Sequence, residues 1–141
     1  MNDDTSIATA AGQRQLRYTH LIYALHSLAV LIGVLGASSI AGRFVFGLPS
    51  IIAVIINYAL RRELTSPLLV SHFRWQIRTF WFALLWLAVV LVVSMPFVLI
   101  AIGGMMAATG FAVIGLWICY RVIRGWLALH DGRSMPMPVA T

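Results

Sequence analysis

Charged residues divide the chain into long apolar runs. A first run of about 25 residues without formal charge lies between Arg17 and Arg43, and a second of about 17 extends from Phe44 to Leu60. Because a membrane-spanning helix needs about 20 apolar residues, the first run predicts one span and the second lies at the short end of the range. Gly47 and Pro49 fit the entrance of a helix, where proline is tolerated. A re-entrant segment remains the alternative for the second run.

The longest apolar run, from Thr79 to Tyr120, has about 42 residues. As one helix it would extend about 60 Å, twice the hydrocarbon thickness, so it must turn back once. Pro96 and the Gly103-Gly104 pair are the two candidate breaks. A turn at Pro96 would leave the third helix short, so we expect the turn at Gly103-Gly104 and a kink at Pro96. The chain is therefore predicted to be an all-α integral membrane bundle of four transmembrane helices, over about 18–41, 44–61, 77–101 and 105–127.

The arginines predict the direction of the helices. All ten basic residues are arginine, against four acidic residues, which gives a net charge of +6. Nine of them fall on one side of the predicted bundle and only Arg43 on the other; the nine are Arg14, Arg17, Arg61, Arg62, Arg74, Arg78, Arg121, Arg124 and Arg133. Because positively charged loops stay in the cytoplasm, both termini are expected there, in a multi-pass protein of the bacterial inner membrane. An odd number of spans would break this agreement.

Composition makes lipid the solvent for much of the chain. Hydrophobic residues make up 61% of it and charged residues 10%, with a mean hydropathy of +0.92, whereas a soluble domain carries about 25% charged residues. Arginines at the ends of apolar runs extend toward anionic headgroups, so we expect anionic lipid and no nucleic acid as the partner. Residues 1–15 and 133–141 are expected to be disordered cytoplasmic tails around a membrane domain of residues 16–132.

A polar block precedes the third predicted helix. On a helix, His72, Gln76 and Thr79 would share one face, while Arg74 and Arg78 would share another. The polar face could line a site for a headgroup, an ion or a peptide. Alternatively, the block is an interfacial anchor whose polar side chains bond to neighbouring helices. At the end of the fourth helix, Arg121 and Arg124 stand among Trp117, Tyr120 and Trp126 in an aromatic belt, so the candidate headgroup contacts are Arg74, Arg78, Arg121 and Arg124.

Two polar residues lie deeper in the predicted bundle. His26 is about 13 Å along the helix axis from Arg17, and Asn57 lies one turn before Arg61. A buried histidine is costly in lipid and is a functional candidate by default, although a neutral His26 bonded across helices is the alternative. The candidate polar site is His26, Asn57, His72 and Gln76.

An enzyme is not expected. The predicted spans contain no acidic residue, so neither a serine–histidine–aspartate triad nor a carboxylate pair forms there. The histidines come from separate segments without metal-site spacing, and the single Cys119 excludes a cysteine cluster. We therefore expect no catalytic residues, no metal and no cofactor.

Three segments carry a resemblance to a known family: Ile56-Asn57-Tyr58 before Arg61-Arg62, the block from Ser71 to Trp81, and Tyr120 to Leu127 with Asp131-Gly132. Over roughly Tyr18 to Met135 the chain resembles small bacterial membrane proteins without established function. These are grouped with the twenty-kilodalton subunit of the chloroplast inner-envelope protein-import translocon. The block from His72 to Trp81 is the most specific part, and the stretch from Ser38 to Gly47 departs from the pattern because it is longer than the expected first turn. The resemblance implies four helices and no catalytic residue.

Two functions follow as hypotheses. In the first, a small helical bundle binds lipid, a second copy of itself or another membrane protein, since small residues recur every fourth position at Gly104, Ala108 and Ala112 and would let helices approach closely. In the second, the candidate polar site lines a path in a transport or protein-translocation pore.

Overall fold

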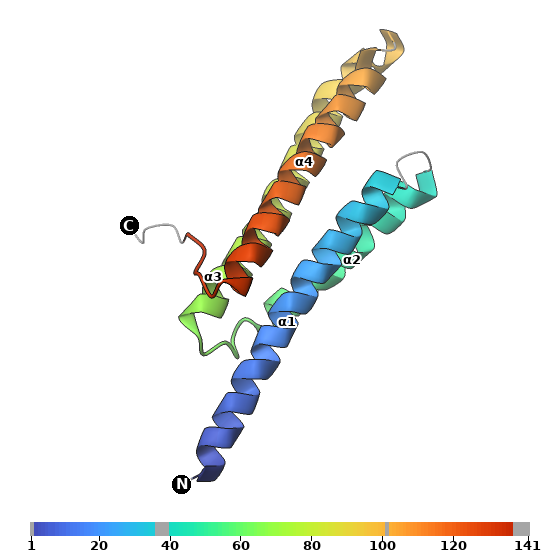
Figure 1. Ribbon diagram of the computed structural model, residues 1–141. Helices are drawn as coiled ribbons and strands as arrows, with labels where there is room; N and C mark the ends of the chain where they lie inside the picture. The colour runs from blue at the N-terminus through green and yellow to red at the C-terminus, as the bar shows by residue number, and fades with distance from the viewer. Residues whose placement is uncertain (1, 36–39, 101, 137–141) are drawn as a thin grey trace.

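The computed structural model describes residues 2–35, 40–100 and 102–136, with side chains described over 9–33, 47–99 and 102–136. These residues form four α-helices and one short 3-10 helix, with no strand in the described ranges, as the all-α prediction requires. Helices α1 (Asn2–Leu35) and α2 (Ile40–Leu60) form one hairpin. Helices α3 (Pro67–Ser94) and α4 (Ile102–His130) form a second, joined through η1 (Met95–Ile100). The two hairpins pack side by side at one end only (Figure 1).

The hydrophobic core lies where the hairpins meet. Three clusters of buried side chains gather near the α2–α3 loop: Tyr23, Leu69, Val122 and Leu129; Ile22, Ala53 and Phe73; and Trp75, Ala128 and Met135. Buried polar residues accompany them, and we call this set the polar junction: Thr19, Tyr23, Asn57, Ser71, His72, Gln76 and Thr79. All four helices therefore contribute to one packed end of the molecule.

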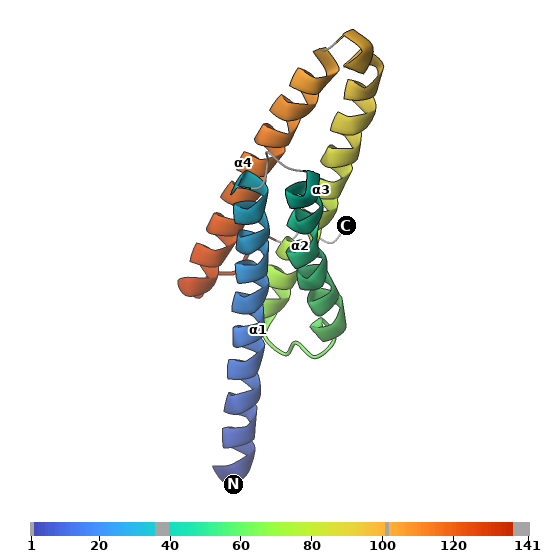
Figure 2. The same ribbon diagram turned by 90° about the vertical axis from the view of Figure 1, so that its right-hand side faces the viewer.

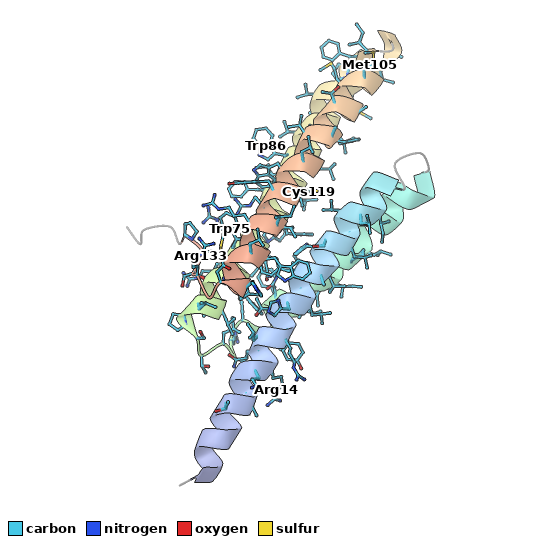
Figure 3. All side chains as sticks on the ribbon, viewed as in Figure 1. Arg14, Trp75, Trp86, Met105, Cys119 and Arg133 are labelled. Atoms are coloured by element: carbon cyan, nitrogen blue, oxygen red, sulfur yellow. The ribbon has the colours of Figure 1, made fainter. Side chains whose placement is uncertain are left out.

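Beyond this core, the α3–α4 hairpin extends past the end of the α1–α2 hairpin (Figure 1, Figure 2). We call residues 81–99 and 102–116 the apolar arm. Its large side chains point outward, as Trp86 and Met105 do in Figure 3, and Leu99 is 95% exposed. Only Ser94 and Gly103 are buried among the arm residues. An exposed apolar surface of this extent is unsuited to water.

Two helices are long and apolar enough to cross a membrane, Pro67–Leu99 and Ile102–His130, and their apolar windows are each only 6% buried. The core helix of a soluble protein would be mostly buried, so their exposure favours lipid as the surroundings. Of the four predicted spans, the described residues thus confirm two, and Gly47–Leu60 is apolar but shorter. The first predicted span, 18–41, includes residues 36–39, and they, like the Arg43 side chain, lie outside the described residues.

The reversal between α3 and α4 lies between the two breaks that the sequence offered. The last α-helical bond of α3 runs from the Met95 N–H to the Leu91 carbonyl, and η1 then contains Pro96. Proline has no N–H and its ring obstructs a continuing helix, so Pro96 ends α3 instead of kinking it. Gly103, the predicted turn residue, lies instead in the first turn of α4. A Cβ there would lie 2.5 Å from both the Ser94 carbonyl oxygen and the Val98 nitrogen, so only glycine fits against η1.

Both predicted tails differ from expectation. Helix α1 begins at Asn2 rather than after Gln15, because this segment contains alanine, glutamine and arginine, which are strong helix formers. At the other end, Gly132 has φ +66° and ends α4 with two bonds, from its own N–H to Leu129 O and from the Arg133 N–H to Ala128 O. This is a Schellman cap.

After the cap, residues 133–136 fold back along α3 instead of forming a free tail. The Met135 N–H donates to the Ser71 hydroxyl over 3.0 Å, and the Met135 side chain is only 4% exposed. Trp75 and Ala128 supply its apolar contacts. The rest of the predicted tail, 137–141, lies outside the described residues.

Candidate functional site

His72 connects three parts of the chain within the polar junction. Its side chain is fully buried, with Nε2 3.0 Å from the Arg133 carbonyl oxygen and Nδ1 2.8 Å from the Tyr23 hydroxyl. A carbonyl oxygen only accepts, so Nε2 carries the proton and donates, and Nδ1 of the neutral ring accepts from the Tyr23 O–H. Both ring nitrogens are thus engaged. Of the two roles that the sequence left open for this block, a ligand site and an interfacial anchor, the geometry of His72 favours the anchor.

Tyr23 is held in place by α4. Its ring stacks on Trp126 at 6.4 Å between centroids, and the Trp126 indole N–H donates to His20 Nδ1 over 3.0 Å. Gly125 makes room for the ring: a Cβ there would lie 2.5 Å from the Tyr23 hydroxyl oxygen. The sequence carried no signal for this contact, since Tyr23 and Gly125 lie far apart in the chain.

The remaining residues of the candidate polar site are buried with incomplete hydrogen bonding. Asn57 is fully buried, and neither atom of its amide has a partner among the described residues. Gln76 donates to the Thr19 carbonyl across 3.5 Å, and its own carbonyl oxygen is unpartnered. An unpaired buried polar group costs about 1–3 kcal/mol, so the fold carries these groups at a measurable cost.

The candidate polar site is not one cluster. Asn57 lies between Ala53 and Leu60 on α2, at helical spacings of four and three, and both of these residues pack against the Phe73 cluster. His26 lies farther along α1 and pairs its Nδ1 with the Ser50 hydroxyl of α2 at 3.2 Å, with Nε2 unpartnered. The structure thus places Asn57, His72 and Gln76 in the junction and His26 between α1 and α2.

Three of the four predicted headgroup arginines gather where α3 and α4 pack together. The Arg121 guanidinium lies 3.6 Å from the centre of the Trp75 ring and 5.0 Å from that of Trp117. Its Nε donates to the Thr79 hydroxyl over 2.8 Å, and the Trp75 indole N–H donates to the Arg121 carbonyl over 3.2 Å. Its Nη2 is buried without a partner in the described chain. Arg121 is therefore fixed in position with one donor group unused.

Arg124 and Arg78 surround this guanidinium. Arg124 lies 5.8 Å from the Trp75 ring and donates through Nη1 to the Tyr120 hydroxyl over 2.9 Å, while Arg78 and Arg124 both repel Arg121 electrostatically. Within the described residues, Asp131 is paired with Arg133, and no carboxylate joins these arginines. We call Arg78, Arg121, Arg124, Trp75 and Trp117 the arginine–aromatic face. Arg74 is exposed on the same helix but has contacts of its own.

Comparison with known proteins adds no relative: no family model, curated protein or solved structure matches the chain. The class of protein that the structure defines is therefore an all-α chain with two helices long and apolar enough to cross a membrane. The family resemblance drawn from the sequence stays a prediction.

Proposed function

We propose that this chain is an integral membrane protein that binds the phosphate of an anionic lipid headgroup on its arginine–aromatic face. The observation that carries the proposal is Arg121, whose Nη2 is buried and unpartnered while Trp75 and Thr79 hold the rest of the guanidinium in place. A guanidinium offers paired donors in a fixed fork, which matches the geometry of a phosphate.

The surroundings of Arg121 support an anion as the ligand. Arg78 and Arg124 add positive charge that no carboxylate of the described chain offsets, so bringing the three together costs energy that an anion would recover. The face lies on the two helices of membrane-spanning length, near the end where the Trp and Tyr residues gather. Tryptophan, tyrosine and arginine are typical of the headgroup level of a bilayer.

The proposed topology extends the one predicted from charge. Four spans with both ends in the cytoplasm would place the arginine–aromatic face at the inner leaflet of a bacterial inner membrane. Anionic lipids attract basic residues at that surface. Impermeant thiol labelling tests the topology: on a Cys119→Ser background, Gln13→Cys and Ser134→Cys should react only after the membrane is opened, and labelling of either one in intact cells would contradict it.

Lipid binding is tested by native mass spectrometry of the protein released from micelles. Phosphatidylglycerol and phosphatidylcholine with matched acyl chains serve as the probes. Arg121→Gln should lower phosphatidylglycerol retention by roughly tenfold, the effect of losing a charge-assisted bond of about 1.4 kcal/mol. Arg121→Lys keeps the charge but loses the forked donors of the guanidinium. Its phosphatidylglycerol retention should therefore lie between that of the parent and that of Arg121→Gln.

Arg62→Gln is the matched control. Arg62 is an exposed arginine in the α2–α3 loop, and its substitution removes the same charge as Arg121→Gln. If Arg62→Gln and Arg121→Gln lower retention equally, binding is a property of net charge and the site is refuted. Melting temperatures in lipid-free micelles establish that the variants are folded.

A transport component is the second candidate, supported by the unpartnered amide of Asn57 and carbonyl of Gln76. Such buried polar groups in a membrane domain mark pathways for ions or polar substrates. Against it, the ring nitrogens of His72 are both committed to contacts. Reconstituted Asn57→Leu and Gln76→Leu proteins that conduct ions as the parent does would exclude these residues from a path.

A further inference from the structure

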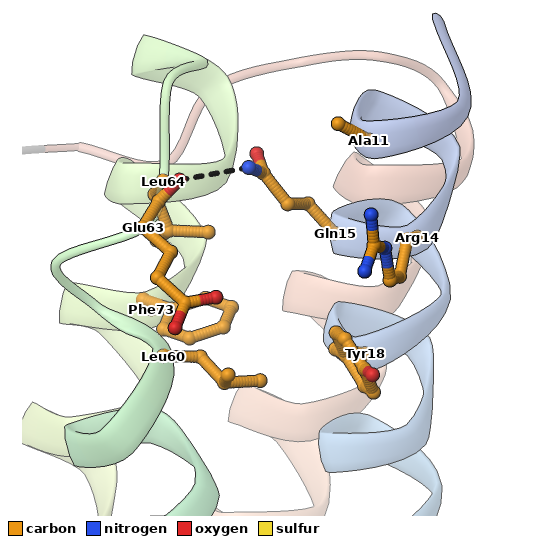
Figure 4. A pocket seen from close by; sticks show the side chains of 8 residues that line it. All are labelled: Ala11, Arg14, Gln15, Tyr18, Leu60, Glu63, Leu64 and Phe73. Carbon is orange, nitrogen blue, oxygen red and sulfur yellow. Dashed lines mark hydrogen bonds between the residues drawn. The ribbon is translucent and has the colours of Figure 1, made fainter. Parts of the chain in front are cut away.

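A pocket of about 200 Å³ lies between the N-terminal half of α1 and the α2–α3 loop, and none of its lining residues belongs to the arginine–aromatic face (Figure 4). It is lined by Ala11, Arg14, Gln15, Tyr18, Leu60, Glu63, Leu64 and Phe73. Figure 4 shows Arg14 on the α1 wall and Glu63 on the loop wall, with the rings of Phe73 and Tyr18 below them. The pocket thus combines opposite charges at its rim with an apolar floor.

The two walls are pinned together without using either charge. The Gln15 side-chain amide donates to the Glu63 carbonyl over 2.8 Å, and its oxygen accepts from the Thr65 N–H and hydroxyl, each at 3.4 Å. Gln15 therefore holds the loop against α1 through Glu63's backbone. The Glu63 carboxylate and the Arg14 guanidinium remain outside any ion pair in the part of the chain that the structure describes.

The carboxylate is unusual for its position. Arg61 and Arg62 immediately precede Glu63, and over residues 9–33, 47–99 and 102–136, whose side chains are described, the one other acidic residue is Asp131, which is paired with Arg133. A surface this basic repels cations, so a carboxylate in the pocket selects for a ligand that carries positive charge beside a negative group. A purely anionic ligand would meet repulsion from Glu63.

The floor of the pocket is suited to an apolar part of a ligand. Leu60 and Leu64 pack against the cluster of Ile22, Ala53 and Phe73, so the bottom of the pocket is apolar and continuous with the core. In the proposed four-span topology Tyr18 begins the first span, which would place the pocket at the level where lipid headgroups meet acyl chains.

From these features we propose that the pocket binds a phosphoethanolamine group, with the phosphate on Arg14 and the primary ammonium on Glu63. A phosphate matches the guanidinium fork, and a primary ammonium donates hydrogen bonds to a carboxylate, which the quaternary ammonium of choline cannot do. Phosphatidylethanolamine and free O-phosphoethanolamine both carry this chemistry. The site is separate from the arginine–aromatic face, and only its depth in the bilayer rests on the proposed topology.

The test uses the full chain in micelles, with phosphatidylethanolamine and phosphatidylcholine of matched acyl chains competing in native mass spectrometry. The parent should retain phosphatidylethanolamine in preference. Glu63→Gln should remove that preference, a change of roughly tenfold, since the two headgroups differ only at the ammonium. Arg14→Gln should weaken both lipids together, because both carry the phosphate.

Arg17→Gln is the control on the same helix, an exposed arginine outside the pocket lining. It should leave the preference unchanged. Equal retention of both lipids by the parent, or an undiminished preference in Glu63→Gln, would overturn the proposal. Melting temperatures equal to the parent's establish folding, and because the Gln15 side chain bonds to the Glu63 backbone carbonyl and not to its carboxylate, Glu63→Gln keeps that contact.

Two further measurements separate the ligand sources and the two sites. If free O-phosphoethanolamine displaces phosphatidylethanolamine, the headgroup is sufficient for binding by itself. If it does not, and the preference for phosphatidylethanolamine persists, the ligand is the whole lipid. Arg121→Gln should lower phosphatidylglycerol retention and leave the phosphatidylethanolamine preference intact, while Glu63→Gln should do the reverse. Each proposal can therefore fail while the other stands.

Discussion

The polar junction and the apolar arm share helix α3 but are built by opposite rules. In the junction, α3 buries Ser71, His72, Gln76 and Thr79 and presents them to α1, α4 and the segment after α4. In the arm, the same helix continues with Leu, Val, Phe and Trp side chains exposed on nearly every face. Polar groups are inside at one end and apolar groups are outside at the other.

A change of solvent along the helix, as proposed, would produce this inversion. In lipid, apolar side chains have no hydrophobic drive to pack against one another, so the arm would need only enough van der Waals contact to close its hairpin. The junction draws its specificity from hydrogen bonds that an apolar medium strengthens, and from close approaches permitted by small residues. Breaking each region should therefore have different consequences.

Gly103→Ala should have the largest effect, because it breaks a tight contact that the arm makes with its own backbone. Its Cβ would lie 2.5 Å from two backbone atoms of the turn, and backbone cannot move aside as a side chain does. We expect a loss of about 3 kcal/mol in the free energy of unfolding, measured by SDS titration in mixed micelles. Gly104→Ala, whose Cβ meets nothing within 4 Å, is the adjacent control. Equal losses in both variants would show that the turn is not tightly packed.

Gly125→Ala tests the close approach in the junction. The new Cβ would lie 2.9 Å from two ring carbons of Tyr23, so the ring must shift and its bond to His72 must lengthen. We expect a loss of about 2 kcal/mol in the same titration. Gly115→Ala on the same helix has open space around its Cβ and should be neutral or slightly stabilising, since alanine favours a helix over glycine. A neutral Gly125→Ala would mean that Tyr23 is not held as the structure shows.

Much of this architecture was accessible from the sequence, and the parts that were not have a physical reason. Gaps between arginines predicted four helices, and spacings of three and four predicted that His72, Gln76 and Thr79 share a face, which α3 buries. The Tyr23–Gly125 contact joins residues that no local pattern relates. The sequence prediction placed the turn between α3 and α4 at Gly103-Gly104, because it treated Pro96 and Gly103 as alternatives. In the structure both are needed: Pro96 ends α3, and Gly103 leaves the space that η1 occupies. The docking of residues 133–136 depends on Ser71 and His72, whose partners lie across the fold.

Tyr23→Phe removes a single hydroxyl and tests the hydrogen bond at the centre of the junction. His72 Nδ1 would remain buried without its donor, at an expected cost of about 1.5 kcal/mol. Tyr120→Phe is the control, because the Tyr120 hydroxyl accepts from Arg124 in an exposed position. If Tyr23→Phe lowers the unfolding free energy no more than Tyr120→Phe does, the buried hydrogen bond stabilises the fold no more than an exposed one.

Asn57→Leu should have the smallest effect, and its sign is opposite to the others. Leucine has nearly the shape of asparagine, and the change deletes two buried polar atoms that lack partners, so the unfolding free energy should rise by about 1 kcal/mol. Gln76→Leu is the comparison, since it also loses the bond to the Thr19 carbonyl and should gain less. A loss of stability in Asn57→Leu would mean that the amide has a partner beyond the described residues. The polar junction would then be a binding or transport surface as well as the structural counterpart of the apolar arm.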